Sequence, residues 1–339
     1  QKALFFNRSG QYEKAIDAFS KAIEIDPEHA NAYNNRGALW YLKEAYDKAI
    51  DDYTKALELR PKSSSFYLNR GAAWFKKGLL DKAISDFDQA VTFDSRSAEA
   101  LNTRGMTLYL MEEYEKAIDD YTDALKLNSE SPDFYNNRGA AWFSIEKYDR
   151  AIVDYSRALA LKPVSVNALK NRGFVWLKKK QYDKAISDYS KALVIDATSA
   201  DIYITRGIAL YEKGEYGKAL IDFVDAVTLS PENADALNRL AWMLAVCPDE
   251  DYRNGIKAIE LAQKAFNLSP SINTLDTLSA ANAEAGHFNV AVEYIEKIIL
   301  KVREVAPEIP KEFITKSEAY KSGKPWRAKT IYPLDEEYE

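Results

Sequence analysis

Apolar side chains recur at spacings of three and four residues along most of the chain, with polar residues between them. Residues 30–43 and 47–59 each carry such a run, which is typical of amphipathic helices. Lys43, Glu44 and Ala45 connect the two runs, and Pro61 follows the second. Because proline cannot continue a helix, the pattern predicts two helices that are joined by a short turn and end before Pro61.

This two-helix segment repeats with a fixed period of 34 residues. Glycines recur in phase at Gly37, Gly71, Gly105, Gly139, Gly173 and Gly207. Aromatic residues recur at Tyr53, Phe87, Tyr121, Tyr155, Tyr189 and Phe223. Small residues mark where two helices approach closely, and large ones fill the space between them. A strict period in this range indicates an all-α solenoid, in which each unit packs against its neighbours.

The unit AYNNRGALWYLKEAYDKAIDDYTKALELRP, residues 32–61, resembles the tetratricopeptide repeat, in the variety with Asn-Arg-Gly that is common in bacterial proteins. The resemblance covers about residues 1–300. It implies a right-handed superhelical solenoid of about nine helical hairpins with a C-terminal capping helix. It implies little about the partner, because the family binds many unrelated proteins.

The phase of the repeat divides the chain into four segments. Residues 1–29 hold a first repeat without the start of its first helix, and residues 30–233 hold six regular repeats. Residues 234–303 hold two divergent repeats with an insertion at 247–255, and residues 304–339 hold the capping helix and an irregular tail. The incomplete first repeat predicts an N-terminal edge that is open to a partner or to self-association.

Each regular repeat has arginine at position seven and aspartate sixteen residues later. The six combinations are Arg36 with Asp52, Arg70 with Asp86, Arg104 with Asp120, Arg138 with Asp154, Arg172 with Asp188 and Arg206 with Asp222. Both positions lie at nearly equal distance from the turn, so an antiparallel hairpin brings them to the same height. The first and the two divergent repeats lack both residues. We therefore predict one ion pair within each hairpin, bidentate by preference, that fixes the register of its helices. The alternative is a track of arginines that binds phosphate or acidic ligands.

The resemblance also implies that the first helices of successive repeats line a concave groove, with positions six and twelve facing inward. Position six is asparagine in four repeats, at Asn35, Asn69, Asn137 and Asn171. Position twelve is aromatic in five, at Tyr41, Phe75, Tyr109, Phe143 and Tyr211. Amides can hold the backbone of an extended peptide, since they donate and accept hydrogen bonds, and rings can grip its apolar side chains. The alternatives are that the asparagines orient their neighbours and that the rings pack between adjacent first helices.

Charge and composition narrow the function further. The net charge of −6 argues against nucleic acid as a partner, and no apolar run approaches the ~18 residues of a membrane span, so we expect a soluble chain. The chain starts at Gln1, without Met or leader, which indicates processing or a fragment and leaves the compartment open. One cysteine, Cys247, and two distant histidines, His29 and His287, exclude a histidine–cysteine metal site.

Neither a glycine-rich phosphate loop nor a catalytic triad can be assembled from the sequence, so we expect no cofactor and no enzyme. The sequence predicts a non-catalytic scaffold that holds a partner protein, as an extended peptide or a helix, in the concave groove of an assembly. One alternative is a subunit that works by self-association. Another is the regulatory or substrate-docking part of a larger enzyme.

Overall fold

The computed structural model describes residues 11–306 and 308–328. In these residues all regular structure is helical, and the helices form consecutive hairpins, as in a solenoid of tetratricopeptide repeats. The chain divides into two compact units, Gln1–Pro163 and Val164–Glu339, which are described separately. The start of the first repeat, where we predict an N-terminal docking edge, falls in residues 1–10 and lies outside the described residues.

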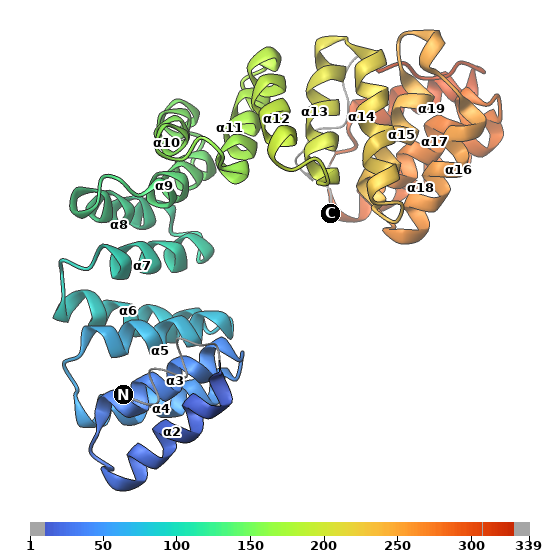
Figure 1. The fold of residues 1–339 in the computed structure, drawn as a ribbon. Coiled ribbons are helices and arrows are strands. Elements are labelled where there is room, and N and C mark those ends of the chain that lie inside the picture. The colour runs from blue at the N-terminus through green and yellow to red at the C-terminus, as the bar shows by residue number, and fades with distance from the viewer. Residues whose placement is uncertain (1–10, 307, 329–339) are drawn as a thin grey trace. The chain divides into compact units, whose positions relative to one another are not determined.

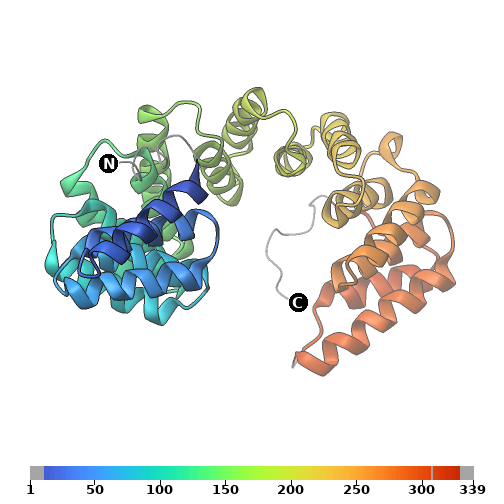
Figure 2. The same cartoon turned by 60° about the horizontal axis from the view of Figure 1, so that its bottom comes forward.

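The first unit is a succession of hairpins in chain order, as Figure 1 and Figure 2 show. Its helices are α2 (Tyr12–Ile25), α3 (Ala30–Leu42), α4 (Tyr46–Leu59), α5 (Ser64–Lys76), α6 (Leu80–Phe93), α7 (Ala98–Leu110), α8 (Tyr114–Leu127), α9 (Pro132–Ser144) and α10 (Tyr148–Leu161). The hairpins pair α3 with α4, α5 with α6, α7 with α8 and α9 with α10. The second helix of each hairpin also packs against the first helix of the next, so apolar clusters follow one another along the unit.

The second unit continues the pattern and ends in an added helix (Figure 1). Its helices are α11 (Val166–Lys178), α12 (Tyr182–Ile195), α13 (Ala200–Lys213), α14 (Tyr216–Leu229), α15 (Ala234–Val246), α16 (Gly255–Leu268), α17 (Ile272–Glu284), α18 (Phe288–Val305) and α19 (Lys311–Lys321). A 3-10 helix, η1 (Glu250–Tyr252), lies in the connection between α15 and α16. Helix α19 packs against α18.

The repeated glycine lets the two helices of a hairpin approach closely. A Cβ atom at Gly37 would lie 2.8 Å from Cε1 of Tyr53, and one at Gly71 would lie 2.6 Å from Cε1 of Phe87. Both rings come from the second helix of the hairpin and are buried. Since real Cβ atoms do not approach this closely, any larger residue would push the ring out of the core.

The turn inside a hairpin holds one residue in the left-handed backbone region. Among the described turns, glycine occupies this place at Gly78, Gly214 and Gly286, with φ of 73°, 86° and 82°. A residue with a side chain occupies it at Glu44, Glu112, Glu146 and Lys180, with φ between 56° and 62°. A side chain in this region costs roughly 1–2 kcal/mol, so the packed helices on either side must hold these turns in place.

A buried ion pair fixes the C-terminal helix. Lys316 on α19 and Asp276 on α17 both have fully buried side chains, and Nζ lies 2.6 Å from Oδ2. The ammonium group also lies 4.9 Å from the centre of the Trp242 ring on α15. Phe313 and Tyr320 on either side of Lys316 join the apolar cluster below α19. The cap is therefore held by charge as well as by apolar packing.

Candidate functional site

Every arginine at position seven forms a bidentate ion pair inside its own hairpin. Nε and Nη2 donate to the two carboxylate oxygens of the aspartate sixteen residues on, at 2.6–2.8 Å, in all six regular repeats. In the pair of Arg138 and Asp154 the arginine side chain is 20% exposed and the aspartate side chain 4%. The hydrogen bonds to Asp154 raise the pKa of the Arg138 guanidinium above its ordinary value, so the guanidinium stays charged.

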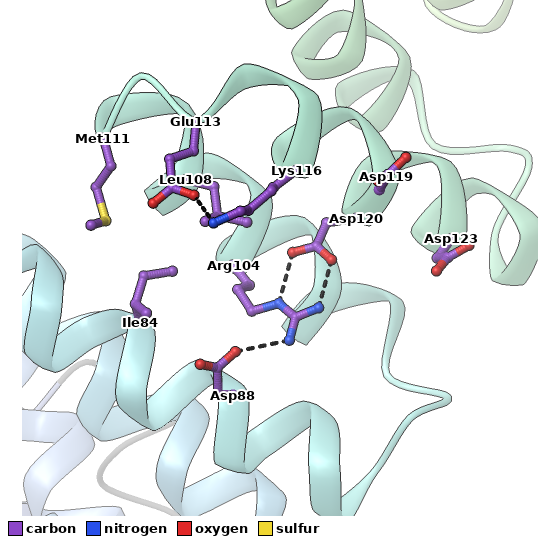
Figure 3. Close-up of a pocket in the computed structure, with 10 residues that line it drawn as sticks. All are labelled: Ile84, Asp88, Arg104, Leu108, Met111, Glu113, Lys116, Asp119, Asp120 and Asp123. Atoms are coloured by element: carbon purple, nitrogen blue, oxygen red, sulfur yellow. Dashed lines mark hydrogen bonds and ion pairs between the residues drawn. The ribbon is translucent and has the colours of Figure 1, made fainter.

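The remaining guanidinium nitrogen reaches the preceding hairpin. Nη1 donates to a side chain sixteen residues earlier, and these pairs are Arg36 with Ser20, Arg70 with Thr54, Arg104 with Asp88, Arg138 with Thr122 and Arg206 with Ser190. Figure 3 shows this arrangement at Arg104, whose guanidinium lies between Asp120 and Asp88. With both edges of the guanidinium occupied, the arginines are arranged as structural clips and leave few donors for an anionic ligand.

Two of the asparagines at position six, Asn69 and Asn137, contact the preceding first helix. Nδ2 of Asn69 donates to Oδ1 of Asn34 at 2.8 Å, and Nδ2 of Asn137 donates to Oδ1 of Asn102 at 3.0 Å. Asn35 and Asn171 are likewise half-buried, on α3 and α11. Each contact uses one of the two N–H donors of Nδ2, so Asn69 and Asn137 can each offer a peptide the second N–H and the oxygen.

The rings at position twelve lie near the hairpin turns. Tyr41 and Tyr109 each meet the tyrosine five residues on edge to face, with ring centres 5.5 and 5.3 Å apart. Phe143 lies 5.5 Å from the ring of Tyr148, and Phe75 is half-buried at the end of α5. These four rings of the first unit are partly accessible to solvent.

Tyr211 differs from the other rings at position twelve. Its side chain is fully buried, and its hydroxyl donates to the carbonyl oxygen of Ala328 at 2.8 Å. Burial raises the pKa of Tyr211, so the hydroxyl remains a donor. The prediction that Tyr211 is open to a partner is corrected here, because a segment of the same chain already covers it.

That segment, residues 324–328, has no regular secondary structure and lies against three first helices of the second unit. The N–H of Ala328 donates to the carbonyl oxygen of Val246 at 3.1 Å, at the end of α15. Nη1 of Arg327 lies 2.7 Å from Oε2 of Glu284, at the end of α17. Together with Tyr211 on α13, these contacts hold an irregular backbone by two hydrogen bonds and one ion pair. No periodic feature of the sequence indicates this contact.

The two histidines lie at helix N-termini, and the cysteine is buried. His29 precedes α3, and its Nδ1 accepts a hydrogen bond from the N–H of Ala32 at 3.1 Å, while His287 precedes α18. Cys247 is buried, and burial raises the pKa of its thiol. Within residues 11–306 and 308–328, no three His, Cys, Asp or Glu side chains come together as metal ligands. Over the same ranges, none of the helices combines the length and the hydropathy that crossing a membrane requires.

Comparisons with known families and structures find the same repeat. The family model described as "Tetratricopeptide repeat" matches residues 30–63, 98–131 and 132–163, and the one described as "TPR repeat" matches residues 6–43 and 177–214. Among curated proteins no match was found.

Several solved structures share the fold. The C-terminal part of a TPR repeat-containing protein from Cytophaga hutchinsonii is 20% identical and covers 70% of this chain and 97% of its own, with a TM-score of 0.57. PilF from Pseudomonas aeruginosa is 21% identical and covers 61% and 94%, with a TM-score of 0.54. A chain of the APC/C hetero-tetramer Cut9–Hcn1 is 19% identical and covers 83% and 54%, with a TM-score of 0.57. At such identities the likeness concerns the fold alone.

Proposed function

We propose that this chain, which carries tetratricopeptide repeats, is a non-catalytic scaffold that binds a peptide or protein partner on its first helices and organises a multiprotein assembly. The observation that carries the proposal is the segment at residues 324–328. Its backbone forms hydrogen bonds with the hydroxyl of Tyr211 and the carbonyl group of Val246. Its Arg327 forms an ion pair with Glu284. A surface that holds one irregular segment in this way has the groups needed to hold another.

The first unit offers a comparable set of groups. Its half-buried rings are Tyr41, Phe75, Tyr109 and Phe143. In the proposed binding mode they contact apolar side chains of the partner, as anchors that bury area at low entropic cost. The asparagine ladder at Asn35, Asn69, Asn137 and Asn171 supplies acceptors for backbone N–H groups of the peptide. The Asn34–Asn69 and Asn102–Asn137 contacts support this role, because they fix the orientation of the amides before a partner arrives.

The test uses a labelled synthetic peptide of residues 324–339 and the full chain. Ala328→Pro in the chain removes the N–H that donates to Val246 and weakens the hold on its own segment. Losing one hydrogen bond of about 0.5–1.5 kcal/mol should raise the affinity of the variant for the added peptide by roughly twofold to tenfold, measured by fluorescence anisotropy. A peptide carrying the same proline is the matched control and should bind more weakly. If neither chain binds the unmodified peptide, the proposed binding role of this face is wrong.

The same contacts also favour a second candidate, self-association, in which the segment of one copy occupies the first-helix face of another. Sedimentation velocity at increasing concentration separates the two. A scaffold that holds its segment in cis stays at one mass, whereas exchange between copies gives a dimer that Ala328→Pro reduces.

A further inference from the structure

Position eleven of the regular repeats is occupied by a tryptophan in four of them. Each indole has a cation above it from position nineteen of the same hairpin: Lys48 over Trp40, Lys82 over Trp74, Arg150 over Trp142 and Lys184 over Trp176, at 4.3–4.5 Å from the ring centre. Trp40 also packs against the apolar cluster that contains Ile16, and Trp74 against the one that contains Ile50. Trp40 and Trp74 therefore each lie in a slot between a cluster that holds an isoleucine of the preceding hairpin and a cation of their own hairpin.

In the hairpin α7–α8 this slot is open. The corresponding residues are Leu108 in place of tryptophan, Ile84 on α6 and Lys116 on α8. All three line a pocket of about 500 Å³, which Figure 3 shows between α6, α7 and α8. This volume lies in the range of natural ligand sites, roughly 300–1,000 Å³. The side chain of leucine is shorter than an indole, so the part of the pocket beside Leu108 corresponds to the place of the ring in the hairpins that carry tryptophan.

The rest of the pocket wall is acidic. Its carboxylates are Asp88, Glu113, Asp119, Asp120 and Asp123, against the two cations Arg104 and Lys116. Asp88 and Asp120 bind Arg104, and Glu113 pairs with Lys116. Asp123 pairs with Lys126 on the same helix, and both of these side chains are exposed. Figure 3 shows Asp119 and Asp123 on α8, one residue before and three residues after Asp120. The net charge of the wall is negative, so a cationic occupant is favoured over an anionic one.

The other regular repeat without the tryptophan has a less acidic wall, which keeps three of the five carboxylates, as Glu215, Asp222 and Asp225. This repeat has Leu210 at position eleven. Ser190 and Ile221 stand where the α7–α8 pocket has Asp88 and Asp119. Among the regular repeats, the α7–α8 hairpin alone combines the missing tryptophan with all five carboxylates.

We propose that this pocket binds a tryptophan side chain of a partner protein that is flanked by basic residues. The ring takes the place between Ile84 and Lys116 that an indole of the chain itself takes elsewhere, and the basic flanks face Asp119 and Asp123. The pocket shares no residue with the asparagine and aromatic positions of the first-helix face. It is therefore an additional site, and binding to it can be tested independently of binding to the first-helix face.

Three capped peptides test the proposal by isothermal titration calorimetry with the full chain: acetyl-Lys-Trp-Lys-amide, acetyl-Lys-Ala-Lys-amide and acetyl-Glu-Trp-Glu-amide. The first should bind at one equivalent, and the other two at least about tenfold more weakly. This comparison needs no variant. Equal affinity of the first and second peptides, or of the first and third, would overturn the proposal.

Leu108→Trp supplies the ring from the chain itself. We expect this variant to lose at least about tenfold in affinity for the Lys-Trp-Lys peptide and to unfold at higher urea concentration, since it fills a cavity. Asp119→Asn, which leaves the slot open, should reduce the preference for Lys-Trp-Lys over Glu-Trp-Glu. Unchanged binding of the Lys-Trp-Lys peptide to a folded Leu108→Trp chain would place its site elsewhere.

Trp142→Leu is the matched control, because it opens the same slot in the next hairpin. There the positions of Asp88, Asp119 and Asp123 are held by Thr122, Val153 and Arg157. The control should therefore gain no second site for the Lys-Trp-Lys peptide. A second equivalent of this peptide on Trp142→Leu would show that the acidic rim plays no part in recognition.

Discussion

At the scale of single residues, the arginine at position seven joins two side chains that come from two different hairpins. Arg138 donates to both oxygens of Asp154 and to the hydroxyl of Thr122. The aspartate is almost fully buried, whereas one-fifth of the arginine side chain is in contact with solvent. Such a pair adds specificity more surely than it adds stability, since the energy of burying the charges offsets much of their attraction.

Removing only the arginine should be costly. Arg138→Leu leaves the carboxylate of Asp154 buried without its partner, and we expect a loss of about 2–4 kcal/mol in the free energy of unfolding. The double change with Asp154→Leu should recover most of the loss, because Leu240 and Leu261 fill these positions as buried residues in the α15–α16 hairpin. A double-mutant cycle by urea denaturation measures the coupling. Additive losses would show that the pair does not act as a unit.

A substitution in the left-handed turns should instead raise the free energy of unfolding. Glu146 has φ of 58°, where glycine is free of the steric cost that a side chain carries. We expect Glu146→Gly to raise the free energy of unfolding by about 0.5–1 kcal/mol, less than the full cost because glycine also gains entropy in the unfolded chain. Gly78→Ala is the reverse change at the same place in another hairpin, where nothing lies within 4 Å of the added Cβ. It should destabilise by a similar amount, and the midpoint of urea denaturation reports both.

At the scale of elements, the C-terminal helix α19 is anchored by a charge in an apolar setting. Lys316 and Asp276 are both fully buried, and the ammonium group lies near three aromatic rings. Burial raises the pKa of Asp276, because the charged carboxylate is desolvated. The anchor therefore depends on the lysine, without which the carboxylate has no cation to offset the desolvation.

Lys316→Met should loosen this helix selectively. We expect amide hydrogen exchange in α19 to become at least about tenfold faster while exchange in the first unit is unchanged, since the loss of about 3–5 kcal/mol is local to the cap. The loss should shrink as the pH falls, because the carboxyl with the raised pKa then takes up a proton and is buried neutral. Lys321→Met is the control on the same helix, since Lys321 pairs with Glu296 at the exposed surface. Equal effects of the two changes would contradict the anchoring role.

At the scale of the whole molecule, periodic contacts follow from the sequence and aperiodic ones do not. The bidentate pairs can be predicted from the sequence, because the arginine and the aspartate, such as Arg138 and Asp154, lie equally far from a turn and occur in the same repeats. The contact to Thr122 was missed, although a serine, threonine or aspartate precedes each of these arginines by sixteen residues. The burial of Tyr211 could not be predicted, because its hydroxyl binds Ala328, which lies 117 residues away in a segment without periodicity.

The junction between regular hairpins has the same form each time, which permits a test on the whole chain. Deleting residues 98–131 removes one repeat and brings Asp88 to the position where Thr122 now meets Arg138. An acceptor is thus retained for the guanidinium. We expect the shortened chain to fold with the helicity of the remaining repeats, as circular dichroism measures, and to lose the site for the Lys-Trp-Lys peptide, because the pocket is removed with Leu108. A collapse of helicity well beyond the deleted part would contradict this.

Arg138 contacts Asp154 in its own hairpin and Thr122 in the preceding one. Because this pattern recurs, one regular repeat can replace another. A gene can gain or lose 34 codons in frame, and the arginine at the new boundary still finds a hydroxyl or a carboxylate behind it. Duplication then lengthens the protein without any compensating mutation. Divergence of one copy afterwards, as at Leu108, can add a binding specificity while the rest of the array continues to fold as before.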